Sequence, residues 1–502
     1  MTLSTDQYGQ FATWRISLLT VFLAAAVGAL SVPSPLFTAA AVLAAAAVVA
    51  LVTLGQGYPS LFLRVLIILL IGYAFLNKGF AYLGVAPVYV GEATLALALL
   101  SLVVTAPRAR LRLLHWLLFA YMAWGLFRTV PYLSRDGLYA VRDAVLWTYA
   151  AFAVAVSFAV EPRHFHAITA LYRKFIPVFL ASVPVVAVVY LLLQSSLPKV
   201  PGSDVPLLVF KAGDSNVHLA AIAAFLLLGL YASRPSAAIL SEILLWPAWL
   251  LAVGVAGAIN RGGLLSVGVG IVAVFLIRPS GRWLRFFWVV ALVVAVLAVL
   301  NPTINVGLDR TISPAQVGRN IQSILSSNGG GDIGLRGTKD WRQRWWSRII
   351  SYTVHGPYFW TGKGFGINLA DDDGFQVEAN HALRDPHNSH LTILARTGVP
   401  GLLLWVTLQG VFGISLLRAF YRARRRGDIL WLQIDGWLFV YWAAMLVNTS
   451  FDVYLEGPQG GIWFWSVFGL GLAALAAQRT TDNITVHTLG MDAYRHANPD
   501  RP

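Results

Sequence analysis

The chain contains no cysteine, which excludes disulfides, iron–sulfur clusters and zinc sites built on thiolates. Charged residues are scarce as well: they make up 12% of the 502 residues, whereas 57% are hydrophobic. An ordinary soluble domain has about 25% charged residues. The alternation of apolar and polar residues that would indicate an outer-membrane barrel is also missing. These absences exclude a soluble protein of ordinary composition.

What the chain has instead is a series of apolar runs of about 20 residues, the length that crosses a bilayer core of about 30 Å. In lipid each backbone amide must find its partner within its own segment, so these runs predict helices. We therefore predict an all-α, polytopic helical integral membrane protein with about 14 transmembrane helices and one large periplasmic loop. The predicted spans are Trp14–Leu30, Leu36–Leu54, Leu61–Leu76, Val88–Thr105, Leu113–Val130, Ala144–Val160, Phe175–Leu193, Val217–Ala232, Leu240–Ala258, Leu264–Ile277, Trp283–Leu300, Val399–Leu417, Trp431–Val447 and Ile462–Ala477.

The net charge of +14 is dispersed among short loops. This distribution favours anionic lipid headgroups as the partner and argues against nucleic acid. The densest basic run, Arg418 to Arg426, predicts a cytoplasmic loop under the positive-inside rule. Counting helices backwards places five further basic loops on the same side, including those at Arg173 and Arg285. Both termini are then expected in the cytoplasm, and no cleavable signal peptide is evident.

The same count divides one membrane domain into four parts. Residues 1–300 form an N-terminal transmembrane bundle, 301–388 a periplasmic loop with the catalytic residues, 389–478 the C-terminal transmembrane helices, and 479–502 a cytoplasmic tail. Within the loop, Asp340 to Tyr352 reads as a helix with Trp341 and Trp345 four residues apart and Arg344 and Arg348 likewise. That spacing suits a helix in the headgroup region, and a lid over a membrane-level cavity is the alternative.

Polar chemistry is concentrated between His381 and His390, which hold three histidines, Arg384 and a carboxylate. His387 is the candidate for proton transfer, because histidine titrates near neutral pH and can take a proton from a sugar hydroxyl. Asn388 is a credible cap for the following helix, and His390 is a candidate supporting residue. The alternative is that these histidines only make hydrogen bonds within the loop.

Arg261 lies at the outer mouth of a predicted helix. A guanidinium offers planar paired donors that fit phosphate oxygens, so Arg261 is a candidate diphosphate clamp, and Gly262 and Gly263 would let the ligand approach the backbone. An arginine at a membrane boundary can also simply snorkel. Further candidates for diphosphate binding are Lys211, Arg142, Arg384 and Arg344.

Three other features predict structural roles and not catalytic or metal-binding ones. His387 and His390 are three residues apart and Asp371–Asp373 precedes them, but the paired pattern of a zinc enzyme is missing, so no metal site is predicted. The sequence from Gly362 to Gly366 lacks the Ser/Thr of a phosphate loop and indicates a tight turn that returns the loop to the membrane. The triple aspartate indicates a solvated turn, and Asp452 is either a surface carboxylate or a partner that orients a histidine.

Three sets of residues occur in an order and spacing that resemble a known family. They are Arg261 to Leu265, Trp360 to Gly366, and His387-Asn388 followed by Leu391, Leu394, Gly398 and Gly401. They are similar to the bacterial O-antigen ligase and polysaccharide polymerase superfamily over about residues 205–415. The resemblance implies a metal-independent glycosyltransferase without a cofactor. It would take a glycan from an undecaprenyl-diphosphate donor at the periplasmic face of the bacterial inner membrane.

The resemblance also assigns roles. A loop histidine as the base maps to His387, and one diphosphate-binding arginine maps to Arg261. Ligases deliver the glycan to lipid A–core, and polymerases deliver it to another lipid-linked repeat unit. The helix count favours a polymerase.

The chain departs from the family at Lys211 to Asn216, where many members have an arginine shortly before a proline-asparagine pair. Lysine keeps the charge but loses the paired donor geometry, so Lys211, Arg142 or a loop arginine would make the second phosphate contact. The competing interpretation is a lipid-linked glycan flippase or transporter without transferase activity. Transporters often contain internal repeats, and none is evident here.

Overall fold

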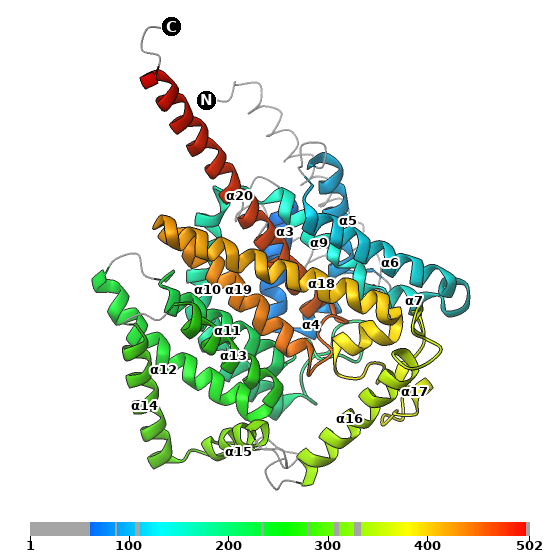
Figure 1. Ribbon diagram of the computed structural model, residues 1–502. Helices are drawn as coiled ribbons and strands as arrows, with labels where there is room; N and C mark the ends of the chain where they lie inside the picture. The colour runs from blue at the N-terminus through cyan, green and yellow to red at the C-terminus, as the bar shows by residue number, and fades with distance from the viewer. Residues whose placement is uncertain are drawn as a thin grey trace, which may run out of the picture.

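The computed structural model describes residues 61–85, 88–105, 111–231, 235–278, 282–305, 311–325 and 333–497 (Figure 1). The helices are α3 (Leu61–Leu76), α4 (Lys78–Ala81), α5 (Val90–Thr105), α6 (Leu113–Asp136), α7 (Leu138–Asp143), α8 (Val145–Thr148), α9 (Ala150–Ala159), α10 (His164–Leu193), α11 (Ala212–Leu228), α12 (Pro235–Ile259), α13 (Arg261–Ile277), α14 (Arg282–Leu300), α15 (Pro314–Leu325), α16 (Ile333–Thr353), α17 (Leu369–Asp373), α18 (Ser389–Arg426), α19 (Ile429–Thr449) and α20 (Pro458–Ala497). Two antiparallel hairpins pair β1 (Gly84–Val85) with β2 (Val88–Tyr89) and β3 (Ile304–Asn305) with β4 (Thr311–Ile312).

Five helices in this part of the chain are long and apolar enough to cross a membrane. They are Leu113–Asp136, His164–Leu193, Ser389–Arg426, Ile429–Thr449 and Pro458–Arg479. The pair Leu138–Thr148 and Ala150–Ala159, bent by 43°, would be a sixth if it is one span. The shorter apolar helices are Leu61–Leu76, Val90–Leu102, Ala212–Leu228, Ile243–Ile259, Arg261–Ile277 and Trp283–Leu297. A helical membrane protein is confirmed, but the count of about 14 spans is not.

Where the structure describes them, the predicted spans lie largely within helices, although α10 and α18 are much longer than the spans predicted there. Leu61–Leu76 has the bounds of α3, and Trp283–Leu300 differs from α14 by one residue. The predicted loop helix Asp340 to Tyr352 lies within α16. The predicted spans Trp14–Leu30 and Leu36–Leu54 lie outside the described residues. The predicted span Ala144–Val160 covers α8 and α9, which a bend separates.

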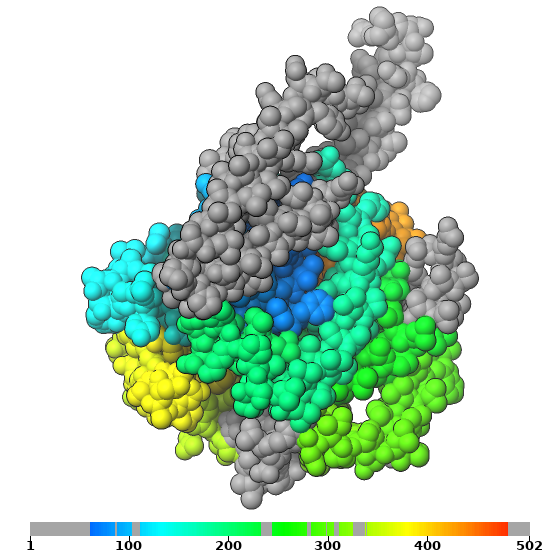
Figure 2. Space-filling view, turned by 180° about the vertical axis from the view of Figure 1, so that it is seen from behind, coloured from blue at the N-terminus to red at the C-terminus, as the bar shows by residue number. Residues whose placement is uncertain are grey.

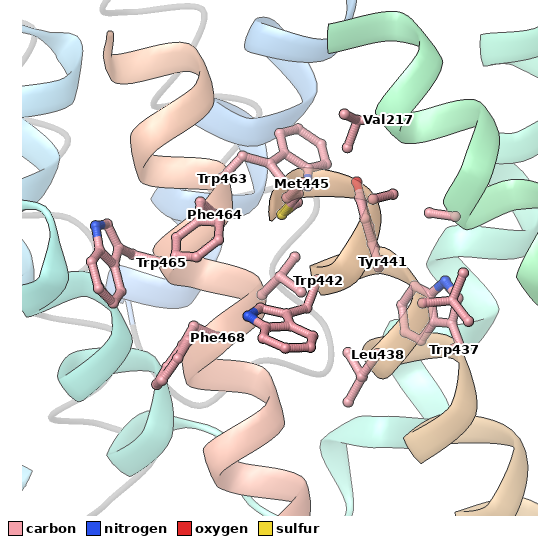
Figure 3. Close-up of a cluster of buried hydrophobic side chains, with 14 of the residues drawn as sticks. Val217, Trp437, Leu438, Tyr441, Trp442, Met445, Trp463, Phe464, Trp465 and Phe468 are labelled. Atoms are coloured by element: carbon pink, nitrogen blue, oxygen red, sulfur yellow. The ribbon is translucent and has the colours of Figure 1, made fainter. Parts of the chain in front are cut away.

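The centre of the bundle is α11, whose residues from Ala212 to Leu228 are all buried. Its apolar side chains point in every direction, which is the pattern of a helix with neighbours all round, and it packs against α13 and α19. Aromatic rings fill the space between α19 and α20 (Figure 3). Phe412 of α18 joins both helices, since its ring centroid lies 3.8 Å from that of Phe468 and 5.7 Å from that of Trp442. The rigid core therefore lies directly beneath the ends of α11, α13 and α18.

A break in α18 sets the direction of the segment that carries the histidines. Gly398 has φ 70° and ψ −174°, so the helix stops and restarts there. Carbonyl groups freed by the break are bonded from elsewhere: Lys363 N donates to Ala395 O (2.7 Å), and Trp124 Nε1 donates to Thr397 O (3.0 Å). Val399 N in turn donates to Phe359 O (2.8 Å). The tight turn predicted at Gly362 to Gly366 is thus present, and it braces the break.

Replacing Gly398 with alanine is expected to destabilise the protein strongly. A Cβ at this position would lie 2.5 Å from Phe359 O, and the backbone conformation, which essentially only glycine adopts, alone costs an L-residue about 1–3 kcal/mol. Gly410 is the matched control, because it lies on the same helix with nothing within 4 Å of its Cβ position. The midpoint of thermal unfolding in detergent should be lower for Gly398→Ala than for wild type and unchanged for Gly410→Ala. Equal midpoints for the two variants would contradict a structural role for the break.

The two ends of the bundle carry different loops. Arg173 Nε donates to Leu230 O (2.7 Å), Arg278 to Leu228 O (3.1 Å) and Arg424 to Ile277 O (3.5 Å). These arginines sit at the C-terminal ends of α11 and α13, where unpaired carbonyls favour cations. At the other end are the N-termini of α11 and α13, together with α15 and α16 (Figure 1). Three of the basic loops that the sequence places on one side of the membrane thus share one end of the bundle.

Candidate active site

His387 lies immediately before the capping residue of α18. Asn388 accepts a hydrogen bond from Leu391 N (3.1 Å), so the predicted cap is present. His387 itself has a left-handed backbone, φ 53°, which is uncommon for a non-glycine residue but is more frequent for histidine than for most, and His381 shares it with φ 55°. Trp346 Nε1 donates to Pro386 O (2.9 Å), and the Trp341 ring centroid lies 6.4 Å from that of His387. The cap on one side and α16 on the other hold the imidazole in place.

Two cations act on this histidine, and a third acts on one of them. Arg342 extends from α16, Arg261 begins α13, and Lys211 precedes α11. The charges of Arg342 and Lys211 both act on His387, and the charge of Arg261 acts on Arg342. Arg342 is half-buried, and its Nε has no hydrogen-bond partner. Two guanidinium groups with overlapping fields are repulsive, so this arrangement favours an anionic ligand.

The loop between α19 and α20 supplies the carboxylate of the site. Asp452 Oδ2 lies 3.4 Å from Lys211 Nζ, which also donates to Val453 O (3.0 Å). Arg342 donates to Phe451 O (3.0 Å), so the same loop holds a second cation. The Asp452 side chain is 15% exposed, so it is not the surface carboxylate that the sequence favoured. It lies close enough to His387 for its charge to act on the ring.

These surroundings set the protonation of His387. Burial lowers the pKa of His387 to about 4, the charges of Arg342 and Lys211 act in the same direction, and Asp452 opposes them. Burial also tends to lower the pKa of Lys211, but Asp214 and Asp452 raise it above its usual range. At neutral pH His387 is therefore neutral and able to accept a proton, while Lys211 is charged.

The loop with Asp452 is fastened to the helix that follows His387. Ser389 Oγ donates to Glu456 Oε2 (2.6 Å) and accepts hydrogen bonds from Tyr454 N and Leu455 N (3.3 Å each). Ser389 is buried, and burial raises the pKa of Glu456 to about 7. These bonds fix the distance between the histidine segment and the carboxylate loop.

Arg384, one of the predicted ligands, belongs to a buried ion-pair network. Its guanidinium donates to Asp143 Oδ2 (3.0 Å) and to Gly366 O (2.9 Å). Arg396 contacts the same Asp143 oxygen (2.9 Å) and Asp385 Oδ1 (3.1 Å). Buried pairs of this kind are costly to break, since removing one partner leaves a buried charge. The network joins α7 to the histidine segment and makes Arg384 a positioning residue.

The other predicted residues lie away from His387. Arg142 is exposed on α7, where its charge acts on Tyr89. Arg344 is exposed on α16. Arg342, two residues earlier, is the arginine that meets the histidine, and sequence reasoning missed it.

The three histidines of the segment have separate partners. His381 Nδ1 lies 2.8 Å from Asp371 Oδ1 at the surface. His390 accepts from Trp405 Nε1 (3.0 Å) and lies 3.0 Å from Thr449 Oγ1, so it packs α18 against its neighbours. In the part of the chain that the structure describes, no three His, Cys, Asp or Glu side chains form a group that could hold a metal ion.

The aspartates at Asp371–Asp373 and the glycine at Gly263 also have structural roles. The turn predicted at Asp371–Asp373 is not solvated throughout, because the Asp373 side chain is fully buried and ion-paired with Lys363. It accepts further bonds from Trp345 Nε1 (2.7 Å) and Tyr352 Oη (3.2 Å). Gly263 brings helices together: a Cβ there would lie 2.9 Å from Gly213 Cα. It therefore does not leave the backbone open to a ligand.

Comparison with protein families gives one match, to the model described as O-Antigen ligase, over residues 246–406. The matched region, less than half of the chain, is similar to the O-antigen ligase family. The match supports the superfamily predicted from the resemblance and indicates an enzyme of the glycosyltransferase type in a bacterial membrane. Comparison with curated proteins gave no match. The matched region contains Arg261, Arg342 and His387, whereas Lys211 and Asp452 lie outside its bounds and reach the same site through the fold.

Proposed function

We propose that the protein is a metal-independent, inverting glycosyltransferase that uses an undecaprenyl-diphosphate-linked glycan as donor. One observation carries the proposal: the charges of Arg342 and Lys211 act on a neutral, half-buried histidine, and Arg261 acts on Arg342, so cations from separate elements meet at one end of the bundle. A base beside a cluster of cations is what transfer from a diphosphate requires, because one group takes a proton while the others receive negative charge.

The transfer is a direct displacement. His387 takes the proton from the acceptor hydroxyl, and the oxygen attacks the anomeric carbon of the donor. The bond from that carbon to the diphosphate oxygen breaks, and Arg261, Arg342 and Lys211 stabilise the charge that develops on the departing lipid diphosphate. A single displacement inverts the anomeric centre. The configuration of the product linkage, measured by NMR against that of the donor, should therefore be opposite.

Asp452 positions Lys211 and acts on His387 through its charge. Its pairing with Lys211 (3.4 Å) keeps the ammonium at the site, and its negative charge stabilises the imidazolium that forms during transfer. Lysine in place of the family's second arginine is thereby fixed by two carboxylates, since Asp214 Oδ1 also lies 3.4 Å away. These contacts support Lys211 as the second diphosphate contact over exposed Arg142.

Donor binding is expected to shift the pH dependence of the reaction. In the free enzyme the pKa of His387 is about 4, so kcat/KM should fall only as pH drops through that value. The bound diphosphate offsets the charges of Arg342 and Lys211, which raises the pKa of His387 in the complex. The acid limb of kcat should therefore lie at higher pH than that of kcat/KM. Coincident limbs, or a kcat/KM limb near the ordinary histidine value of about 6.5, would contradict this electrostatic coupling.

The acceptor decides between two versions of the reaction. An O-antigen ligase would deliver the glycan to lipid A–core, and a polymerase would deliver it to another lipid-linked repeat unit. Either reaction fits a site at the periplasmic face of the inner membrane, with both termini in the cytoplasm and residues 301–388 as the periplasmic loop. Glycan banding of a deletion strain separates them: single units indicate a polymerase, and full-length chains on the carrier lipid indicate a ligase.

A further inference from the structure

Asn77, at the turn between α3 and α4, has a backbone conformation that asparagine rarely adopts. Its φ is 51° and its ψ is −125°, which glycine accepts without strain because it has no Cβ. The residue is buried, with 7% of its surface exposed. A buried asparagine at such a position is expected where its side chain makes interactions that glycine could not.

Both ends of the Asn77 amide have a partner. Oδ1 accepts a hydrogen bond from Lys78 N (2.8 Å), which caps α4. Nδ2 donates to Asp214 Oδ2 (3.0 Å), so this bond joins the α3–α4 turn to the first turn of α11, 137 residues further along the chain. Asp214 is buried as well, and its other carboxylate oxygen lies 3.4 Å from Lys211 Nζ. Buried contacts therefore connect Asn77 through Asp214 to the lysine of the candidate site.

The backbone of the same turn contacts the segment between α10 and α11. Val209 N donates to Leu76 O (3.4 Å). At Gly79 the fit is so close that a Cβ would overlap Leu207 O. Figure 2 shows α3 (blue) and α10 (blue-green), the helices from which these two segments continue, next to each other on one face. The α3–α4 turn is thus packed by main chain and side chain against the segment that ends at Lys211.

We propose that Asn77 and Asp214 are positioning residues that hold the Lys211 ammonium at the diphosphate of the lipid-linked donor. This rests on the proposed function and adds what places one of its cations. A lysine presents a point charge on a flexible stem, so it lacks the rigid donor geometry of an arginine. The buried contacts with Asp214 and Asn77 supply the missing rigidity from outside the side chain.

The charges of Asp214 and Lys211 depend on each other. Burial raises the pKa of Asp214; the charge of Lys211 opposes this, Asp452 adds to it, and the hydrogen bond from Asn77 opposes it. Burial tends to lower the pKa of Lys211, but Asp214 and Asp452 raise it above its usual range. The other titratable groups around them are Tyr454, His387, Arg342 and Arg261. Removing the charge of Asp214 should therefore lower the pKa of Lys211.

The first test separates the side chain of Asn77 from its backbone and needs no turnover. Asn77→Gly accepts a φ of 51° and removes the bond to Asp214, whereas Asn77→Ala removes the same bond and keeps the backbone strain. Calorimetry with inorganic diphosphate and purified protein should show about three- to tenfold weaker binding in both variants, the effect of one lost hydrogen bond. The midpoint of thermal unfolding should be lower for Asn77→Ala than for Asn77→Gly.

The outcomes of this test are distinct. Binding that follows the midpoint, weakened by alanine and not by glycine, would make Asn77 a purely structural residue and overturn the proposal. Wild type that does not bind diphosphate would contradict both the proposal and the proposed function. Wild type that binds diphosphate, with the loss expected in both variants, but transfers no glycan would contradict the proposed function alone.

The second test changes the charge of Asp214 and keeps its shape. In wild type, kcat/KM should not fall below the ordinary lysine pKa of about 10.4. In Asp214→Asn the alkaline limb should move to lower pH, because Lys211 keeps only Asp452 as a carboxylate partner. Asp204→Asn is the matched control, since Asp204 is fully exposed and pairs with Lys199 on the segment before α11. A limb that stays in place in Asp214→Asn, or moves equally in both variants, would overturn the proposal.

Discussion

Replacing His387 with alanine is expected to reduce glycan transfer by about 100- to 10,000-fold, the usual contribution of a general base. The variant should remain in the membrane, because Asn388 still caps α18 and the ion pairs of Arg384 and Arg396 do not involve the imidazole. Transfer is measured with purified protein and a lipid-linked donor.

His381→Ala is the matched control for this variant. Both histidines belong to the same segment, but the His381 side chain is 67% exposed and contacts a surface aspartate. It should transfer glycan at the wild-type rate. Full activity in His387→Ala, or equal losses in the two variants, would exclude His387 as the general base.

Arg342→Lys is expected to lower kcat/KM by about 10- to 100-fold, a loss on the order of one or two hydrogen bonds to a charged group at 1.5–3 kcal/mol each. Lysine keeps the charge but lacks the planar pair of donors that fits two phosphate oxygens. Arg342 is held by Phe451 O and has a buried Nε without a partner, so a donor group is available for the ligand. Arg261→Lys should behave in the same way.

Arg344→Lys tests whether position within α16 decides the effect. Arg344 is exposed on the same helix, so its replacement should leave kcat/KM close to wild type. Substrate titrations give kcat/KM for Arg342→Lys, Arg261→Lys and Arg344→Lys, and the three values are compared. If Arg344→Lys loses as much activity as Arg342→Lys, α16 acts through its overall charge, and a defined diphosphate contact is excluded.

Helix positions were accessible from sequence because apolar runs of membrane length have few alternatives in lipid. The bounds of α3 and α14 follow from this rule almost residue by residue. The contacts that brace a break are harder to predict. The sequence signals the break at Gly398, since Pro400 follows it and the predicted span begins at Val399. It does not signal the turn at Gly362, 36 residues earlier in the chain, that docks against the break.

Some residues of the candidate site could likewise be predicted from the sequence, and others could not. His387 and Arg261 could be chosen because their residue types and flanking residues carry the chemistry. Arg342 could not, because it flanks the buried stripe of Trp341 and Trp345 on one side as Arg348 does on the other. Only the packing of α16 against the histidine segment decides which flank faces the site.

Charge partners were the least predictable feature. Arg384 was chosen as a phosphate ligand, yet its partner Asp143 lies 241 residues away in the chain. Asp452 reaches Lys211 across the same kind of separation. Ion pairs between distant elements depend on the fold as a whole, and a single sequence contains no local signal for them.

The most direct test of the account follows the glycan itself. Purified protein is reconstituted in vesicles with a glycan on undecaprenyl diphosphate, an acceptor and a chelator, without nucleotide. The account predicts that the glycan becomes attached to the acceptor with inverted configuration in wild type, and that His387→Ala leaves it on the donor. Movement of the intact donor across the bilayer, with the glycan still attached to it in wild type, would contradict the account and identify a flippase.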